Sequence, residues 1–552
     1  MQSLQTKAEA THYQETSRHS DVLAFCDALA KRSPLVHRTS IGQSGEGQDI
    51  VALVISDKKC FTPALAKKQK KPIVMIEANI HAGEVEGKEA SLALARDLAL
   101  TPLGKGIVDK VCVVLIPNFN PDGNDRISPK NRALNLQELE GQVNPPGGVG
   151  MRYTGEGWNL NRDNMKQEAP ETRHLAAFLQ HFWPHLFIDC HTTDGSLHRF
   201  DLTHDCPRGN DALFQPVRAF NRTMLETVAK TIEKKHGYSA TWYGNFVKEP
   251  DPESGWHTYP ALPRFGSHYR GLIGRLDVLL ETYSYISYER RCAVTRAWLL
   301  ELLRYAAKNS VKLRAVVETQ EATTIARGKT IDPRTTVAIA HGVARRDDKG
   351  ALLFDYPAHA LDGDALKIRS FDRESLKKRV YPGKKRVDYN TPHMRSFIPT
   401  ASVRMPAGYL APPSLAERLR GHGITFDTLA KDTSFDVESY LVAKKEETFS
   451  PDVAAAVPPP GQSEVPLSQR PPPTRFETVL TVRAEARTIV APAGTLVVST
   501  AQRAGVLAVY LLEPCSDDGL TRWQFLDREI EVGALFPVHR LLTHTRPRQK
   551  PE

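Results

Sequence analysis

The chain has 552 residues, of which 41% are hydrophobic and 25% are charged, and its formal net charge is +9. This composition is typical of a globular protein and excludes a fibrous or wholly disordered chain. The length favours two or three domains, because single hydrophobic cores stop growing at about 250–300 residues. The 73 basic residues are offset by 64 acidic ones along the whole chain, so no basic stripe indicates a nucleic-acid partner.

Cysteine usage and hydropathy limit the class of protein further. Seven cysteines occur without a CxxC pair, which predicts neither a disulfide framework nor a thiolate zinc site. No run of about 18 apolar residues predicts a membrane span, and residues 1–20 lack the apolar stretch of a signal peptide. We expect a soluble chain without a membrane partner. Its compartment stays open, since a leader removed before Met1 would make it extracytoplasmic. Its oligomeric state also stays open.

An N-terminal arm, 1–19, is followed by short β-branched runs that alternate with helical patterns. This alternation predicts an α/β catalytic domain over 20–313 with a mainly parallel sheet. The predicted strands are 50–56, 72–80, 111–119, 185–191 and 275–283. The helical patterns, with apolar residues three and four apart, are 87–98, 171–181 and 288–307.

Beyond residue 313 the sequence changes character. Residues 314–449 predict a mixed α/β extension, which carries no motif of known chemistry. The proline-rich segment 450–475 cannot continue a helix or a central strand, so it predicts a linker or surface excursion. Residues 476–552 predict a small β-rich unit with strands at 476–484, 494–500 and 505–514. We expect this C-terminal region to pack against the catalytic domain or to narrow access to its site.

Two potential metal ligands, His81 and Glu84, follow the predicted strand 72–80. Zinc accepts imidazole nitrogen and carboxylate oxygen, and catalytic zinc sites usually have three protein ligands and a water. Taken alone, the pair is also typical of residues that cap a helix. His191 ends the predicted strand 185–191, and ligand sites in open α/β sheets lie at the carboxyl ends of strands. His191 is therefore the expected third ligand.

Two loops carry further polar motifs. Asp122 lies in the turn-like sequence after strand 111–119, and it is a candidate to orient His81, because zinc-bound imidazoles usually donate their second N–H to such a group. A simple turn is the alternative. Asn161 and Arg162 lie in a glycine-rich loop and offer an amide and a guanidinium fork that suit a carboxylate. A salt-bridged surface loop is the alternative for this pair.

Glu281 ends the apolar run of the predicted strand 275–283. A carboxylate that terminates a buried strand is costly unless it is paired or functional. Beside a zinc-bound water it would act as general base, whereas a salt-bridged strand end is the structural alternative.

The ordered set resembles the carboxypeptidase A-like zinc metallocarboxypeptidases: His81-x-x-Glu84, Asn161-Arg162, His191 and Glu281. The match covers about 20–310, and the C-terminal extension is similar to that of bacterial members. The resemblance implies an α/β fold with a mixed, mainly parallel eight-stranded sheet flanked by helices. It also implies one Zn²⁺ per chain and a peptide or peptide-like substrate with a free C-terminal carboxylate.

The resemblance also implies individual roles. His81, Glu84 and His191 would bind the metal, Asn161 and Arg162 the terminal carboxylate, and Glu281 would activate the water. Arg132 is the candidate that would stabilise the oxyanion. A count without gaps from the turn that contains Asp122, however, places Asn135 at the position of the family's oxyanion arginine. Tyr259 and Tyr269 are both candidates for the tyrosine that closes over the substrate.

The specificity and the reaction each leave alternatives open. Arg264, His268, Arg270 and Arg275 lie where the resemblance places the specificity pocket and hint at acidic side chains, with surface exposure as the alternative. An amidohydrolase for acylated amino acids or cell-wall peptides would use the same carboxylate clamp. A zinc-fold binding module that has lost catalysis is the non-enzymatic reading, but no ligand or base is missing.

Overall fold

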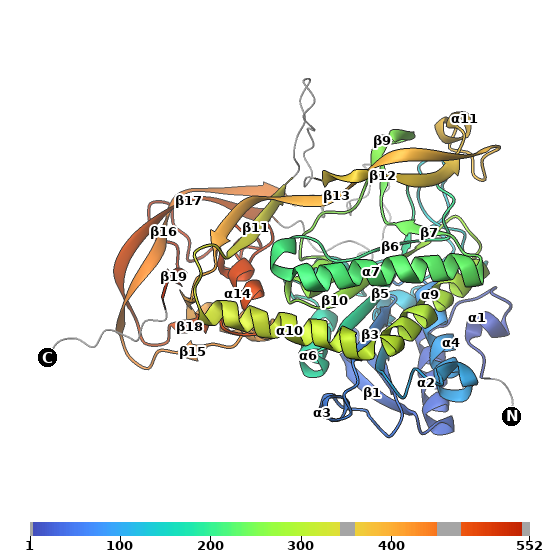
Figure 1. Cartoon of the computed structure of the whole chain (residues 1–552), viewed down its shortest axis with the longest axis horizontal. Coiled ribbons are helices and arrows are strands. Elements are labelled where there is room, and N and C mark those ends of the chain that lie inside the picture. The colour runs from blue at the N-terminus through green and yellow to red at the C-terminus, as the bar shows by residue number, and fades with distance from the viewer. Residues whose placement is uncertain (1–3, 343–358, 450–475, 544–552) are drawn as a thin grey trace.

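Strands and helices alternate through the first half of the chain in the computed structural model, which describes residues 4–342, 359–449 and 476–543 (Figure 1). Eight strands form one sheet in the order β1-β2-β4-β3-β5-β10-β6-β7. Their bounds are β1 Val36–Gln43, β2 Asp49–Ile55, β3 Ile73–Ala78, β4 Cys112–Ile116, β5 Leu186–Thr193, β6 Leu202–Asp205, β7 Ala240–Trp242 and β10 Leu276–Tyr283. The predicted strands of this domain are confirmed.

The sheet is mixed, as predicted. β4, β3, β5 and β10 run parallel to one another at its centre, and β6 pairs parallel with β7. The pairs β1–β2, β2–β4 and β10–β6 are antiparallel. The central strands are buried on both faces, which explains why their sequences are continuous apolar runs.

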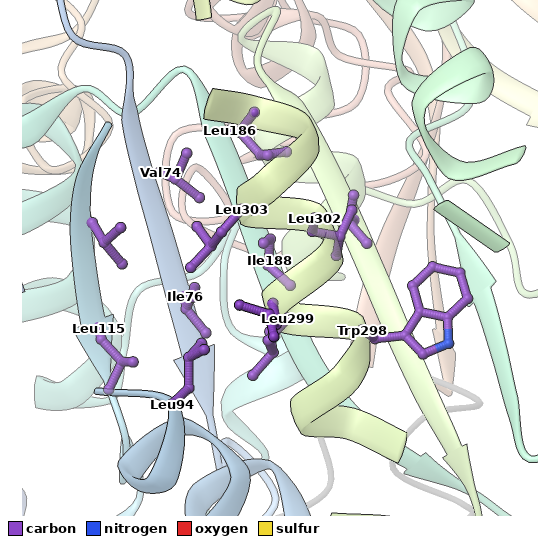
Figure 2. Close-up of a cluster of buried hydrophobic side chains, with 14 of the residues drawn as sticks. Val74, Ile76, Leu94, Leu115, Leu186, Ile188, Trp298, Leu299, Leu302 and Leu303 are labelled. Carbon is purple, nitrogen blue, oxygen red and sulfur yellow. The ribbon is translucent and has the colours of Figure 1, made fainter. Parts of the chain in front are cut away.

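Helices cover both faces of this sheet, and the two-residue alternation of each strand separates two apolar cores. Val74 and Ile76 of β3 face the larger core, whereas Ile73 and Met75 face the other. Figure 2 shows part of the larger core, where β-strand side chains meet Leu299 and its neighbours on α9. Helices on this side include α2 His19–Arg32, α4 Glu86–Leu100, α7 Asp211–His236 and α9 Tyr288–Lys308, and the opposite side carries α3 Pro63–Lys68 and α6 Pro170–Phe182.

The predicted boundary at residue 313 falls inside a helix. α10 (Ser310–Lys329) follows α9 almost directly and packs Leu313 and Val317 into the larger core. β11 (Thr336–Gly342) follows α10 and runs away from the first domain. The change of composition at 313 therefore marks no break in the packing.

A five-stranded sheet lies above the first domain in Figure 1. Its order is β11-β13-β9-β8, and β12 pairs with β13. The additional bounds are β8 Asn245–Lys248, β9 Asp251–His257, β12 His359–Phe371, β13 Arg386–Arg404 and α11 Arg373–Lys377. Because β8 and β9 belong to the first half of the chain, this sheet joins the extension to the catalytic domain.

A six-stranded antiparallel sheet forms the C-terminal region, in the order β15-β18-β14-β19-β16-β17. Its strands are β14 Gly408–Ala411, β15 Asp427–Thr428, β16 Thr433–Phe449, β17 Phe476–Ala491, β18 Leu496–Ser499 and β19 His539–Leu541. β16 and β17 pair along their whole length, although they lie on either side of 450–475, which is outside the described residues. Residues before and after the proline-rich segment therefore share one sheet.

One predicted strand of this region is wrong. Residues 505–514 read as a strand, but Gly505–Leu512 forms helix α14. All eight residues of α14 are buried, so the helix is apolar on every side and has no periodic pattern to reveal it. α14 packs in a core with residues of the first domain such as Met165 and Leu272, which fixes the C-terminal region against that domain.

Candidate active site

Two adjacent parallel strands bring the proposed ligands together. β3 ends at Ala78, just before the turn that carries His81 and Glu84, and β5 beside it carries His191. Asn79 in that turn has a φ of +67°, and its amide donates to Asn118 Oδ1 at 2.7 Å and Asn124 Oδ1 at 3.1 Å. These bonds hold a backbone conformation that asparagine tolerates better than most residues.

His81, Glu84 and His191 form one cluster, and their ligand atoms lie within 4.8 Å of one another. The Glu84 carboxylate lies between the two rings: Oε1 is 3.0 Å from His81 Nδ1, and Oε2 is 3.0 Å from His191 Nδ1. All three side chains are buried. Two imidazoles and one carboxylate are the donor set of many catalytic zinc sites, so these residues fit a zinc ion.

Protonation of the cluster follows from its surroundings. Burial and the nearby Arg152 lower the pKa of His81 to about 3, which leaves a neutral imidazole. Burial opposes ionisation of Glu84, but His81 and Arg132 hold its pKa well below the usual range. Burial also acts against a charged His191, yet Asp189 and Glu84 raise the pKa of this ring. The carboxylate is thus ready to bind a cation.

The outer nitrogens of the two imidazoles have polar neighbours. His81 Nε2 is 3.1 Å from Asn159 Oδ1, and His191 Nε2 is 3.1 Å from Asp189 Oδ1. Such partners orient metal-ligating rings. Asp122 does not take the predicted place beside His81. Its carboxylate instead accepts bonds from Ser44 Oγ, the Glu46 backbone N–H and Gln48 Nε2, because the turn points it toward the segment between β1 and β2.

A cavity of about 1030 Å³ opens over the cluster, and Glu281 lies on its wall. Glu281 is the register partner of His191 on the adjacent strand β10. Burial raises the pKa of Glu281 to about 8, with the charge of His191 opposing this shift and that of Glu84 adding to it. Glu281 and the ligand cluster therefore face the same enclosed space.

Arg132 reaches the cluster from the loop after α5 (Pro121–Asp125). Its Nη1 is 3.0 Å from Glu84 Oε1, and its other nitrogens face Gln142 Oε1, the Thr192 carbonyl and Asp194. The loop approaches closely because residue 83 is glycine: a Cβ there would lie 2.8 Å from Arg132 Cδ. Arg132 is therefore held by several acceptors at once.

Arg152, which sequence reasoning missed, also faces the cluster. Its Nη1 lies 3.5 Å from Glu84 Oε1, and its side chain is 32% exposed. Within the described ranges no other acceptor is paired with this guanidinium, although Arg152 lines the cavity. Arg152 lies nine residues before Asn161, and this spacing forms no motif that a single sequence would reveal.

Asn161 and Arg162 both lie on the short 3₁₀ helix Leu160–Arg162 and line the cavity. Asn161 Nδ2 is 3.4 Å from His191 Nε2, and its Oδ1 accepts a bond from the Gly266 N–H at 3.0 Å. The Arg162 guanidinium lies over the Phe265 ring at 4.3 Å. The predicted clamp residues thus adjoin the metal cluster.

The two candidate tyrosines lie in different places. Tyr259 lines the cavity, and its hydroxyl contacts Ser267 Oγ. Tyr269 is on α8 (Gly266–Leu272), does not line the cavity and packs in the core shared with the C-terminal region, where its hydroxyl lies 3.0 Å from His422 Nδ1. Tyr243, not selected from the sequence, lines the cavity with its ring centroid 5.7 Å from that of Tyr259.

Only one of the four residues that hinted at acidic specificity lines the cavity, and it is Arg264. Arg270 is fully paired behind the site with Asp189 and Asp277. Arg275 pairs with Glu321, and His268 Nδ1 accepts a bond from the Arg208 backbone N–H. The hint is therefore wrong for these three, because α8 and the turn after it place His268, Arg270 and Arg275 in the protein interior.

Residues from the second half of the chain also line the cavity. Arg379, which follows α11, donates from Nη1 to the Gln137 carbonyl and so ties the extension to the loop that carries Glu138. Residues of the C-terminal region, Glu477, Asp517 and Arg522, also line the cavity. In the described part of the chain, no helix has the length and apolar character needed to cross a membrane.

Comparison with known proteins gives one consistent result. A model of the zinc carboxypeptidase family matches residues 22–249. Carboxypeptidase 2 of Trichophyton equinum is 21% identical over 95% of this chain and 86% of its own length. Human carboxypeptidase D is 31% identical over 134 residues, which are 23% of this chain and 9% of that protein. A metallo-carboxypeptidase from Burkholderia cenocepacia is 19% identical, with a TM-score of 0.38 over 53% of this chain and 70% of that one.

An eight-stranded mixed sheet with a buried His–Glu–His cluster at its strand ends defines a metal-binding enzyme of the α/β class. The matched residues 22–249 include all three ligands and the Asn161-Arg162 pair. Through residues 22–249, the chain is similar to the zinc carboxypeptidase family. The resemblance and fold class predicted from the sequence are confirmed. Glu281 lies beyond the matched residues.

Proposed function

We propose that the protein is a zinc-dependent carboxypeptidase that removes C-terminal residues from peptides. The observation that carries the proposal is the shared cavity: the His81–Glu84–His191 cluster, the Asn161-Arg162 pair and Glu281 all line it. Its volume of about 1030 Å³ is at the upper end of the range for small-molecule sites, which suits several residues of a peptide.

His81, Glu84 and His191 are the proposed zinc ligands, one ion per chain. When bound, zinc would polarise a substrate carbonyl and lower the pKa of a water molecule toward about 7. Asn159 and Asp189 are the proposed orienting partners of the two imidazoles. Arg132 helps to keep the Glu84 carboxylate ionised through its contact with Oε1.

Glu281 is the proposed general base. It takes a proton from the attacking water at one carboxylate oxygen and then delivers this proton to the amine that leaves. Its position on β10, in register with His191, keeps the carboxylate at the cavity wall without a flexible loop. Partial burial limits competing solvent at this carboxylate.

Asn161 and Arg162 are proposed to bind the terminal carboxylate of the substrate. A guanidinium fork forms two parallel bonds to a carboxylate, and the adjacent amide adds a third donor. The Phe265 ring beneath Arg162 restricts the fork to one plane. Tyr259 is the proposed closing tyrosine, since Tyr269 lies away from the cavity.

Arg152 is the proposed oxyanion stabiliser in place of Arg132, because Arg132 is already engaged by several acceptors. Arg152→Gln is expected to lower kcat about 10²–10³-fold, the usual cost of removing one donor to a tetrahedral intermediate. Zinc content should not change, and Arg152→Lys should recover part of the rate. Steady-state kinetics with metal analysis tests this, and an unchanged kcat in Arg152→Gln would assign the role elsewhere.

A substrate panel tests the proposed function itself. The zinc-loaded protein is incubated separately with unmodified peptides, with C-terminally amidated peptides and with N-acyl amino acids, and the products are followed by mass spectrometry. Only the unmodified peptides should lose their C-terminal residues step by step. Turnover of N-acyl amino acids alone would show the alternative amidohydrolase. Absence of turnover in every group would favour a binding module.

A further inference from the structure

One wall of the cavity is built by the C-terminal region. Glu477 of β17 and Arg522 line it together with Arg264, which lies in the loop before α8. Arg264 links the two halves of the chain: Nη1 donates to Glu477 Oε1 at 3.1 Å, and Nε donates to Asp518 Oδ1 at 2.9 Å. Arg264 adjoins Phe265, on which the proposed clamp residue Arg162 stacks. The wall therefore begins next to the carboxylate clamp.

The carboxylates of this wall are already engaged. Glu477 accepts from Arg264 and from Arg522 Nε, the latter at 2.6 Å. Asp517 accepts from the Tyr510 hydroxyl and from the His341 backbone N–H. Asp518 accepts from Arg264 and from the Trp523 indole N–H at 2.8 Å. Each of these three carboxylates therefore already accepts hydrogen bonds from donors of this chain.

Arg522 differs from these groups. Only its Nε is paired within the described ranges, so its two terminal nitrogens have no acceptor there. The side chain is 26% exposed and lines the cavity, and its backbone carbonyl accepts from the Thr478 N–H at 2.9 Å. Arg522 is thus a partly exposed guanidinium of the cavity lining that is held at Nε, and its two terminal nitrogens have no acceptor in the described part of the chain. A guanidinium in this state suits a carboxylate.

The charge of the wall permits an anion. Glu477 and Asp517 line the cavity with Arg264 and Arg522, and Asp518, which does not line it, pairs with Arg264, so the group has a small formal excess of acid. Burial raises the pKa of Asp517 to about 6 and that of Asp518 to about 7. Part of that excess is therefore neutralised by protons near pH 7.

We infer that Arg522 is a specificity-determining residue, which binds the side-chain carboxylate of a C-terminal glutamate or aspartate. The inference rests on the proposed carboxypeptidase function. Asn161, Arg162, Arg264 and Arg522 line the same cavity, so a residue whose terminal carboxylate is bound by Asn161 and Arg162 would have the Arg264–Arg522 wall within the same space. The C-terminal region then selects the substrate, in addition to enclosing the cavity.

Kinetics with benzoyl-Gly-Glu, benzoyl-Gly-Gln, benzoyl-Gly-Leu and benzoyl-Gly-Lys test the inference on the full chain. We expect the highest kcat/KM for Glu. Arg522→Gln should lower the Glu-to-Leu ratio of kcat/KM about 10–100-fold, the worth of a charge-assisted hydrogen bond, and leave the Leu value near wild type. Arg522→Lys should restore part of the ratio.

Arg528→Gln is the matched control, since Arg528 is exposed in the same segment and does not line the cavity. Thermal unfolding checks that the variants fold. A Glu-to-Leu ratio that Arg522→Gln leaves unchanged, or a wild-type preference for Leu or Lys, would overturn the inference while leaving the carboxypeptidase intact. Failure of wild type to release any of the four residues would instead overturn the proposed function.

Discussion

Replacement of Glu281 by glutamine is expected to lower kcat about 10²–10⁴-fold, because the amide cannot accept the proton of the attacking water. The change is nearly isosteric, and Glu281 is not one of the three clustered ligands. Zinc content and substrate binding should therefore stay close to wild type. The measurement is kcat from steady-state hydrolysis of a peptide, with zinc determined on the same sample.

Glu138→Gln provides the control for this change, since Glu138 lines the same cavity but is exposed and does not belong to the ligand cluster. It should retain nearly full activity. A Glu281→Gln protein with wild-type kcat would show that another group moves the proton. A variant that lost zinc together with activity would show that Glu281 helps to hold the metal.

Replacement of His81 by alanine is expected to abolish zinc binding at micromolar concentration, and activity with it. Loss of an outer hydrogen-bond partner already weakens metal sites about 10–100-fold, and loss of a ligand removes a bond to the ion itself. The variant also leaves Glu84 without the ring on its Oε1 side. Zinc affinity by competition with a chromogenic chelator measures the effect.

His181→Ala is the matched control, because His181 is exposed in the last turn of α6. It should bind zinc as the wild type does. Full zinc affinity in His81→Ala would remove His81 from the site. Circular dichroism of the metal-free variant should keep the wild-type spectrum, since none of the three clustered residues belongs to either apolar core.

The central domain was predictable because its strands are buried on both faces. Runs such as 72–80 and 185–191 are continuous apolar segments bounded by turns, and they form β3 and β5. The same signal failed at 505–514, where an equally apolar run forms α14. A short run that is buried on all sides has no period that distinguishes helix from strand.

Pairing between distant segments was not predictable from composition. The proline-rich residues 450–475 suggested a division between units, yet β16 and β17 pair on either side of them. Likewise β8 and β9, from the first half of the chain, join the sheet of β11 and β13. Such contacts depend on side-chain packing across the molecule and leave no local pattern in either segment.

The candidate ligands were predictable because they lie at the carboxyl ends of recognisable strands, where the parallel arrangement brings them together. Arg152 was not, because it lies in an irregular loop whose path is set by glycines at 83 and 150. The wall formed by Arg522 was equally hidden, since it depends on how the C-terminal region packs against α8.

Titration of metal-depleted protein with Zn²⁺ tests the central claim most directly, with release of the C-terminal amino acid from a peptide as the signal. Activity should be absent without metal, rise linearly and saturate at one zinc per chain, with a single residue removed at a time. Release that persists in the metal-depleted protein, or a fully zinc-loaded protein that releases no C-terminal residue, would contradict a zinc-dependent carboxypeptidase.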